Sequence, residues 1–359
     1  MDKFSRKLHF DFSVNQKIMR LIGAIDAFNG KWNVLEENEN RYLKELRYIA
    51  TIESIGSSTR IEGATLTDKK IEELLKNINI TEMQTRDEQE IIGYYEVLEL
   101  LYENYTDIKL SENYIKQLHH LLLKHSTKDE RHRGNYKYLS NKVVATYPTG
   151  KQSTIFVTTN PILVESEMRE LLEWINEQFI AKEIHTLIII ALFIYEFLSI
   201  HPFQDGNGRL SRLLTTLCLL QNKYEFIQYI SFENHIEQNK KAYYKALMNG
   251  QRNRNTKDEQ ISQWLFFFLE SLKSLTEKLE QKYNLFKQKG VYLNERQKKI
   301  REYITENQPI KTGDLSIRFP EISLATLKKD LQYLRNEQVL DMLGKGKGSM
   351  YVINNKIKK

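Results

Sequence analysis

Cysteine is almost absent from the sequence, and its scarcity excludes several classes of protein. The single residue Cys218 can form no disulfide within the chain, and one thiol cannot build a cysteine-rich metal site. Because Cys218 lies in an apolar run, we expect it to fill space in the core. With 41% hydrophobic residues, the chain can build that core without cross-links.

Long hydrophobic runs are also missing. The longest apolar segment covers residues 187–200, only fourteen positions, and it contains Glu196. A membrane-spanning helix needs about 18 uncharged apolar residues. The first ten residues lack the apolar core and the cleavage site of a signal peptide. We therefore expect a cytoplasmic protein with no membrane segment.

Internal repeats and low-complexity tracts are absent, and no linker rich in proline, glycine or serine precedes Gly290. The length of 359 residues favours two or three domains. Residues 291–359 hold fourteen Lys and Arg against eight Asp and Glu, whereas residues 1–290 hold 39 of each. This uneven charge favours a separate C-terminal domain with an acidic partner.

The chain is organised around residues 201–212, HPFQDGNGRLSR, which lie between two apolar segments. Residues 187–200 and 213–220 both have the pattern of buried helices. Pro202 cannot continue the first helix, and Asp205 stands where the N-cap of the second helix would be. Two glycines then let the backbone approach a ligand closely. The pattern predicts a tight polar loop between two core helices.

The side chains of this loop have the chemistry of a nucleotide-phosphate site. Free N–H groups at the start of the second helix attract an anion, and Arg209 and Arg212 add positive charge suited to phosphate. Asp205 is a hard oxygen ligand for Mg2+, and His201 can take a proton near neutral pH. The alternative is a capped loop whose polar groups satisfy one another, but six such groups between two core helices favour a site.

This stretch resembles the Fic motif, H-x-F-x-[D/E]-G-N-G-R-x-x-R, and matches it at all eight specified positions. The resemblance implies a mainly helical Fic fold and an enzyme that moves the AMP part of ATP onto a hydroxyl of a protein. It also implies that His201 is the general base and that Asp205 holds Mg2+.

The other motif positions have implied roles in binding ATP. Phe203 would anchor the loop in the core, and three consecutive residues would form an anion hole for the α-phosphate. Two arginines would bind the β- and γ-phosphates. The implied nucleotide-binding residues of the motif are Phe203, Gly206, Asn207, Gly208, Arg209 and Arg212.

A second short motif lies before this core. Residues 40–62 have the pattern of a helix, which Gly63 is suited to end. Ser58 and Glu62 share a face of that helix, and with Gly63 they resemble the inhibitory motif [S/T]-x-x-x-E-[G/N] of Fic proteins. In that class the glutamate pairs with the second motif arginine, here Arg212, and displaces the γ-phosphate. The alternative is an ordinary surface glutamate near a helix end.

Residues 128–160 change from helical to β-prone composition. The runs 143–147 and 154–159 predict two strands, and residues 148–152 predict the turn between them. In Fic proteins a hairpin at this place is the flap that holds the target segment by strand pairing. A surface hairpin without a ligand is the alternative.

The remaining segments are mostly patterned as helices. The Glu-x-Asn and Tyr-Tyr pattern that contains Tyr243 and Tyr244 resembles Fic sequence beyond the motif, which makes both tyrosines candidates for the adenine pocket. Aromatic pairs on a helix are more often core. The spacing of His119, His120 and His125 does not place three imidazoles on one face, so we expect solvated or capping roles and no metal. Further helices are predicted at 14–28 (with a break at 30–32), 68–77, 85–103, 111–123, 165–181, 185–200 and 261–287.

Residues 291–359 predict three helices, then a strand, a basic glycine turn at 344–349 and a strand. This order resembles a winged helix-turn-helix, with residues 324–336 as the recognition helix. That helix bears Lys328, Lys329 and Arg335, which favours DNA as a partner, but also Asp330 and Glu337, which leaves protein docking open.

These patterns predict three parts: an N-terminal helical region over 1–110 with the inhibitory helix at about 40–63, a Fic catalytic core over 111–290, and a winged-helix domain over 291–359. The expected partners are ATP, a target protein (for which the chain itself is a candidate) and DNA, with a homodimer left open. Three alternatives to AMP transfer stay open: transfer of another phosphate-containing group, removal of AMP, and a DNA-binding regulator whose Fic domain senses nucleotide.

Overall fold

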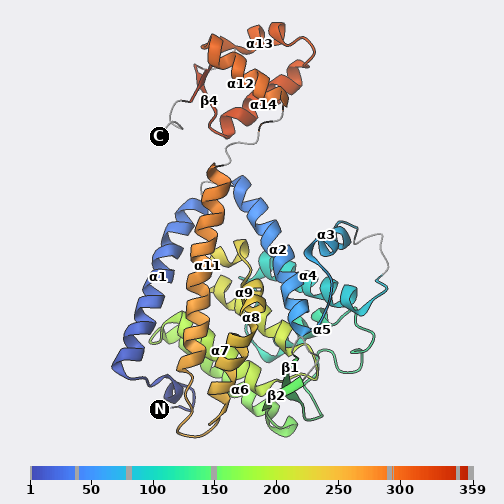
Figure 1. Ribbon diagram of the computed structural model, residues 1–359, viewed down its shortest axis with the longest axis vertical. Helices are drawn as coiled ribbons and strands as arrows, with labels where there is room; N and C mark the ends of the chain where they lie inside the picture. The colour runs from blue at the N-terminus through green and yellow to red at the C-terminus, as the bar shows by residue number, and fades with distance from the viewer. Residues whose placement is uncertain are drawn as a thin grey trace. The chain divides into compact units, whose positions relative to one another are not determined.

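The computed structural model describes residues 2–36, 40–77, 83–146, 152–288, 293, 295–344 and 348–354. Over these residues the protein has fourteen α-helices, two short 3-10 helices and two small antiparallel sheets (Figure 1). The predicted mainly helical class is confirmed. The chain divides into two compact units, residues 1–282 and residues 283–359. No helix within the described residues combines the length and the apolar character of a membrane span.

The first unit begins with helices whose ends follow from local chemistry. The side-chain oxygens of Thr85 and Ser111 accept hydrogen bonds from the first turns of α4 and α5. Gly63 ends α2 with a φ of 114°, a conformation that favours glycine. These elements are η1 (Ser5–Leu8), α1 (Phe12–Glu36), α2 (Asn40–Glu62), α3 (Asp68–Lys76), α4 (Arg86–Asn104) and α5 (Glu112–Leu122).

The predicted break at residues 30–32 is wrong, because α1 continues through Gly30 to Glu36. Trp32 is buried, and its ring stacks on Phe28 at a centroid distance of 5.6 Å. Burying a large aromatic side chain outweighs the roughly 1 kcal/mol that a glycine costs inside a helix.

A hairpin follows α5 and consists of β1 (Lys142–Thr146) and β2 (Gln152–Val157). The strands are antiparallel, with Val143 opposite Phe156 and a bulge directly after Val143. Both strands were predicted. The predicted turn at 148–152 lies outside the described residues, except for Gln152 at the start of β2.

The rest of the first unit forms the helical core around the motif. Almost every side chain of α7 and α8 is buried, as their apolar sequences predict. The helix before them starts earlier than predicted, since Asn160 caps it and Pro161 is its first residue. The elements are α6 (Pro161–Ala181), α7 (Thr186–Ile200), α8 (Asn207–Gln221), η2 (Glu225–Tyr229), α9 (Phe232–Gln238), α10 (Lys240–Gln251) and α11 (Ser262–Gln288). α11 runs beside α1 (Figure 1), where Lys17 Nζ lies 2.7 Å from Glu270 Oε1.

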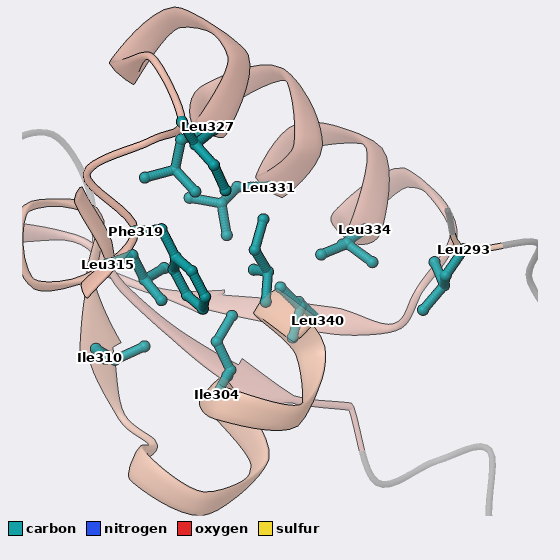
Figure 2. Close-up of a cluster of buried hydrophobic side chains, with 11 residues drawn as sticks. Leu293, Ile304, Ile310, Leu315, Phe319, Leu327, Leu331, Leu334 and Leu340 are labelled. Carbon is teal, nitrogen blue, oxygen red and sulfur yellow. The ribbon is translucent and has the colours of Figure 1, made fainter. Parts of the chain in front are cut away.

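The second unit has its own hydrophobic core. Leucines 327, 331 and 334 of α14 point toward Phe319 and Leu340 (Figure 2). The sheet is antiparallel in the order β3-β5-β4. The elements are α12 (Glu295–Asn307), β3 (Ile310–Lys311), α13 (Thr312–Arg318), α14 (Leu324–Asn336), β4 (Leu340–Leu343) and β5 (Met350–Ile353). Of the predicted basic turn, residues 345–347 lie outside the described residues.

Candidate active site

The motif loop begins where α7 ends and closes where α8 begins. His201 terminates α7 with a φ of 53°. The predicted N-cap at Asp205 is wrong, because Gly206 occupies that position with a φ of 77°, which favours glycine. Asp205 Oδ1 instead accepts a hydrogen bond of 2.6 Å from the N–H of Gly206. The carboxylate therefore shapes the turn just before the helix.

Two side chains fix this loop from inside. The Asn207 amide closes a ring with Phe203: its Oδ1 accepts from the Phe203 N–H at 2.9 Å, and its Nδ2 donates to the Phe203 carbonyl at 2.7 Å. The Phe203 ring is fully buried and stacks on His119 at a centroid distance of 3.8 Å. The side chain of Asn207 thus holds the loop, which leaves backbone N–H groups at the start of α8 for an anion.

His119 is a site residue that the sequence did not indicate. The predicted solvated or capping role is wrong, since His119 is fully buried. Its Nδ1 accepts a hydrogen bond of 2.8 Å from the Gly134 N–H, so its Nε2 carries the hydrogen and donates to the Asp205 carbonyl at 3.0 Å. His120 is exposed, and His125 lies 2.9 Å from Glu96. No group of three or more His, Cys, Asp or Glu residues among the described residues is placed to hold a metal.

A pocket of about 250 Å3 opens over the motif loop. It receives residues from α2, the start of β1, the loop, α8 and α10. Phe203 and Arg209 do not line this pocket, although the resemblance implies that Arg209 binds a phosphate of ATP. The predicted site residues that line the pocket are Glu62, His201, Asp205, Gly206, Asn207, Gly208, Arg212, Tyr243 and Tyr244.

His201 is a neutral imidazole with one nitrogen free to accept a proton. Its Nδ1 lies 3.3 Å from the Leu198 carbonyl, which can only accept, so Nδ1 carries the hydrogen and Nε2 has the lone pair. Burial lowers the pKa of His201 to about 4, and the charge of Lys137 acts in the same direction. The residue is therefore a proton acceptor at neutral pH.

Arg212 is buried and already engaged by α2. Its Nε donates to Ser58 Oγ at 2.8 Å, and its Nη2 donates to the Ser58 carbonyl at 2.9 Å and to Glu62 Oε1 at 2.8 Å. The contact with Glu62 is one hydrogen bond, so a bidentate pair with this glutamate is not formed. A Cβ built on Gly208 would come within 2.2 Å of Glu62 Oε1. The Glu62 carboxylate therefore lies against the first turn of α8.

Arg209 pairs with other carboxylates. Its Nη1 lies 3.2 Å from Glu90 Oε2, and its Nη2 lies 3.5 Å from Asp205 Oδ1. Arg86 joins both acids, with Nε 2.7 Å from Glu90 and Nη2 3.4 Å from Asp205. Burial acts to raise the pKa of Asp205, but Arg209, the Gly206 N–H and Arg86 together hold it below its usual value. Asp205 is thus an anion in the pocket.

The remaining candidates have unequal access to the pocket. Tyr243 is buried, and its ring packs edge-on against Trp264 and Phe267, so it belongs to the core as well as to the pocket wall. Tyr244 is partly buried and lines the same wall. Gly63 is exposed, and it contributes by ending α2 directly after Glu62.

Comparisons with known sequences place this site in a family. Residues 109–219 match the family model described as Fic/DOC family. The protein adenylyltransferase Fic of Drosophila willistoni is 28% identical over 211 residues, which cover 57% of this chain and 39% of the relative. The protein of the same name from Nematostella vectensis is 26% identical over 205 residues, which cover 52% of this chain and 44% of the relative. The chain thus spans about two fifths of the length of these curated relatives.

Solved structures show a similar fold. A Fic family protein from Desulfovibrio desulfuricans is 21% identical, with a TM-score of 0.65 and coverage of 98% of this chain and 99% of that chain. A Fic domain containing signaling protein from Bacteroides thetaiotaomicron is 23% identical, with a TM-score of 0.59 and coverage of 72% and 96%. The family match, which includes the motif, shows that residues 109–219 form a Fic domain, and the two solved structures share its fold.

Proposed function

We propose that the protein is an adenylyltransferase that moves AMP from ATP to a hydroxyl side chain of a protein and is held inactive by Glu62. The observation that carries the proposal is the pocket, where a neutral His201 faces the start of α8 together with Asp205 and Arg212. A base, an anion-binding helix start and two oppositely charged side chains are the parts that phosphoryl-group chemistry needs. The names of the curated relatives favour AMP as the transferred group.

In this mechanism His201 Nε2 takes the proton of the acceptor hydroxyl. The hydroxyl oxygen attacks the α-phosphorus, the bond from that phosphorus to the bridging oxygen breaks, and pyrophosphate leaves. N–H groups at the start of α8 stabilise the charge on the α-phosphate. Arg212 binds the γ-phosphate and orients it, and Tyr244 forms part of the wall for the adenine.

Mg2+ fits the chemistry of this pocket. Its usual ligands are one or two carboxylates together with substrate phosphates, and Asp205 is an ionised carboxylate at the pocket wall. Asp205 would hold the ion, which supplies positive charge for the phosphates. His119 and the Gly206 N–H hold the backbone and the carboxylate of Asp205 at the pocket wall.

The position of Glu62 supports the proposed autoinhibition. Its carboxylate lies against Gly208 in the first turn of α8 and accepts a hydrogen bond from Arg212. In the proposed mechanism the γ-phosphate needs this same arginine. The Glu62 carboxylate and the γ-phosphate cannot both occupy this position, because the two anions repel each other and compete for Arg212. ATP would then bind with displaced phosphates, and a displacement of about 1 Å at the reacting centre can cost roughly a hundredfold in rate.

We further propose that the β1–β2 hairpin is a target-binding flap. Lys142 and Val143 of β1 line the same pocket as His201. A strand of a target protein that pairs with β1 would bring its hydroxyl side chain to the imidazole. In the alternative, the hairpin lies at the surface and binds no ligand.

Two labelled forms of ATP test the transferred group. With the label on the α-phosphate, AMP transfer marks the acceptor protein; with the label on the γ-phosphate, it does not. Phosphate transfer would give the opposite pattern. Labelling from γ-phosphate alone would overturn the proposal, and so would an absence of labelling from either form in a chain that lacks Glu62.

For the second unit we propose a winged-helix domain that binds DNA. Asp330, which weakened this prediction at the level of sequence, is buried and paired with Arg296 at 2.6 Å and with Gln297. The exposed face of α14 therefore presents Lys328, Lys329 and Arg335 without that acid. A basic helix between a first helix pair and a β-ribbon is suited to the major groove.

Binding to a DNA duplex should weaken steeply as salt rises. Replacing both Lys328 and Lys329 with alanine should reduce the slope of log affinity against log salt by about two, because each lysine releases about one counterion. Fluorescence anisotropy with a labelled duplex measures this slope. Lys298→Ala, which removes an exposed lysine of α12 paired with Glu295, is the control with a native slope. If the full chain binds no duplex at low salt, DNA is the wrong partner and protein docking replaces it.

A further inference from the structure

Lys137 is a buried cation to which the proposed mechanism gives no role. It lies between α5 and β1 with 3% of its surface exposed. Its Nζ lies 3.1 Å from the Ile200 carbonyl, and its backbone N–H donates to the Pro202 carbonyl at 2.8 Å. Lys137 therefore bonds to both residues that flank His201.

The surroundings of Lys137 Nζ require an ammonium. Besides Ile200, Nζ lies 2.9 Å from Asn141 Oδ1 and 2.7 Å from Thr158 Oγ1, and the Thr158 hydroxyl uses its own hydrogen toward Asn141. Three acceptors match the three N–H donors of a protonated lysine. A neutral amine would leave one acceptor without a hydrogen. The cation also lies at the carboxyl end of α7, where the helix dipole favours it.

These contacts join the hairpin to the motif loop. Asn141 directly precedes β1, and Thr158 directly follows β2. Asn141 also donates from Nδ2 to the Phe203 carbonyl at 2.9 Å. A single side chain, Lys137, thus holds both ends of the hairpin and the end of α7 in one arrangement.

We propose that Lys137 is a positioning residue: its ammonium holds the base His201 and the β1–β2 hairpin in register, and it fixes a positive charge on the residues that flank the imidazole. This role rests on the proposed transferase activity, because it is in that reaction that His201 acts as base and the hairpin holds the acceptor.

The pH dependence follows from the groups around the two side chains. For His201, burial and Lys137 lower the pKa to about 4, whereas the Leu198 carbonyl, Glu62 of α2 and Asp205 of the loop act to raise it. For Lys137, burial lowers the pKa to about 8, opposed by Glu167 of α6. Transfer needs neutral His201 and protonated Lys137, so activity should fall as pH drops toward 4 and as pH rises through about 8.

The first test follows the His201 ring by NMR and needs no turnover. In the native chain the ring should stay neutral down to about pH 5. In Lys137→Met the positive charge is gone, so the pKa of His201 should rise. The ring should then take up a proton at a higher pH than in the native chain. Lys137→Arg keeps the charge and should behave as the native chain does, as should Lys109→Met, which removes an exposed lysine. An unchanged pKa of His201 in folded Lys137→Met would overturn the electrostatic part of the proposal.

The second test measures AMP transfer with each variant combined with Glu62→Gly. Lys137→Met should lower the rate about a hundredfold, because the base and the acceptor segment lose their common anchor, while ATP still binds. Lys137→Arg should recover part of that rate and should no longer lose activity as pH rises through 8, since a guanidinium stays charged. If Lys137→Met does not fold, the rate of AMP transfer by Lys137→Arg above pH 7 becomes the deciding measurement. A loss of rate near pH 8 like that of the parent would contradict the proposal. If the Glu62→Gly parent is inactive, the proposed transferase activity is wrong. The NMR titration would still test the proposed role of Lys137, because it needs no turnover.

Discussion

Glu62→Gly should label itself with AMP about a hundredfold faster than the native chain. The substitution removes the carboxylate that lies against Gly208 and takes one N–H of Arg212. Arg212 keeps its two hydrogen bonds to Ser58, so its guanidinium stays oriented while one N–H becomes available to the γ-phosphate. The measurement is the initial rate of incorporation from ATP labelled on the α-phosphate.

Two further variants show whether the gain has this cause. Adding Arg212→Ala to Glu62→Gly should abolish the gain, because the released arginine is what orients the phosphates. Glu45→Gly places the same substitution at an exposed position of the same helix and should leave the native rate unchanged. A folded Glu62→Gly chain that labels no faster than the native one would refute the inhibitory pairing.

His201→Ala should lower AMP transfer by about 10²–10⁴-fold, the usual cost of losing a general base. The variant is best compared in the active Glu62→Gly chain, where the loss is easily measured. ATP affinity, determined by calorimetry, should change little, since in the proposed mechanism the phosphates would bind to α8, Arg212 and an ion at Asp205. His120→Ala, at an exposed position of α5, is the matched control. A His201→Ala rate near that of the parent would mean that another group takes the proton.

The elements that were predicted well have strong local signals. Residues 201–206 form the loop between the apolar helices α7 and α8, and Gly63 ends α2 directly after the glutamate that contacts Arg212. In the second unit α14 has the predicted bounds, because Ser323 caps it and its leucines recur at helical spacing. Such features depend on neighbouring residues and are visible in one sequence.

The parts that were missed depend on contacts between distant segments. His119 meets Asp205 across 86 positions, and Lys137 meets Ile200 across 63, so no local pattern could have paired them. Glu90 did give a signal, since a charged residue stands on the buried face of α4, where a carboxylate needs a cationic partner. The break proposed at Gly30 failed because tertiary packing of Trp32 overrode a weak local preference.

Intact-mass spectrometry of the Glu62→Gly chain after incubation with ATP and Mg2+ tests the central claim most directly. We expect a species heavier by one AMP group, located by fragmentation on a serine, threonine or tyrosine hydroxyl, and we expect it to be absent when His201→Ala is added. A species heavier by phosphate alone would contradict AMP transfer. So would a chain that binds ATP and yet leaves both itself and the proteins of an added cell extract without AMP.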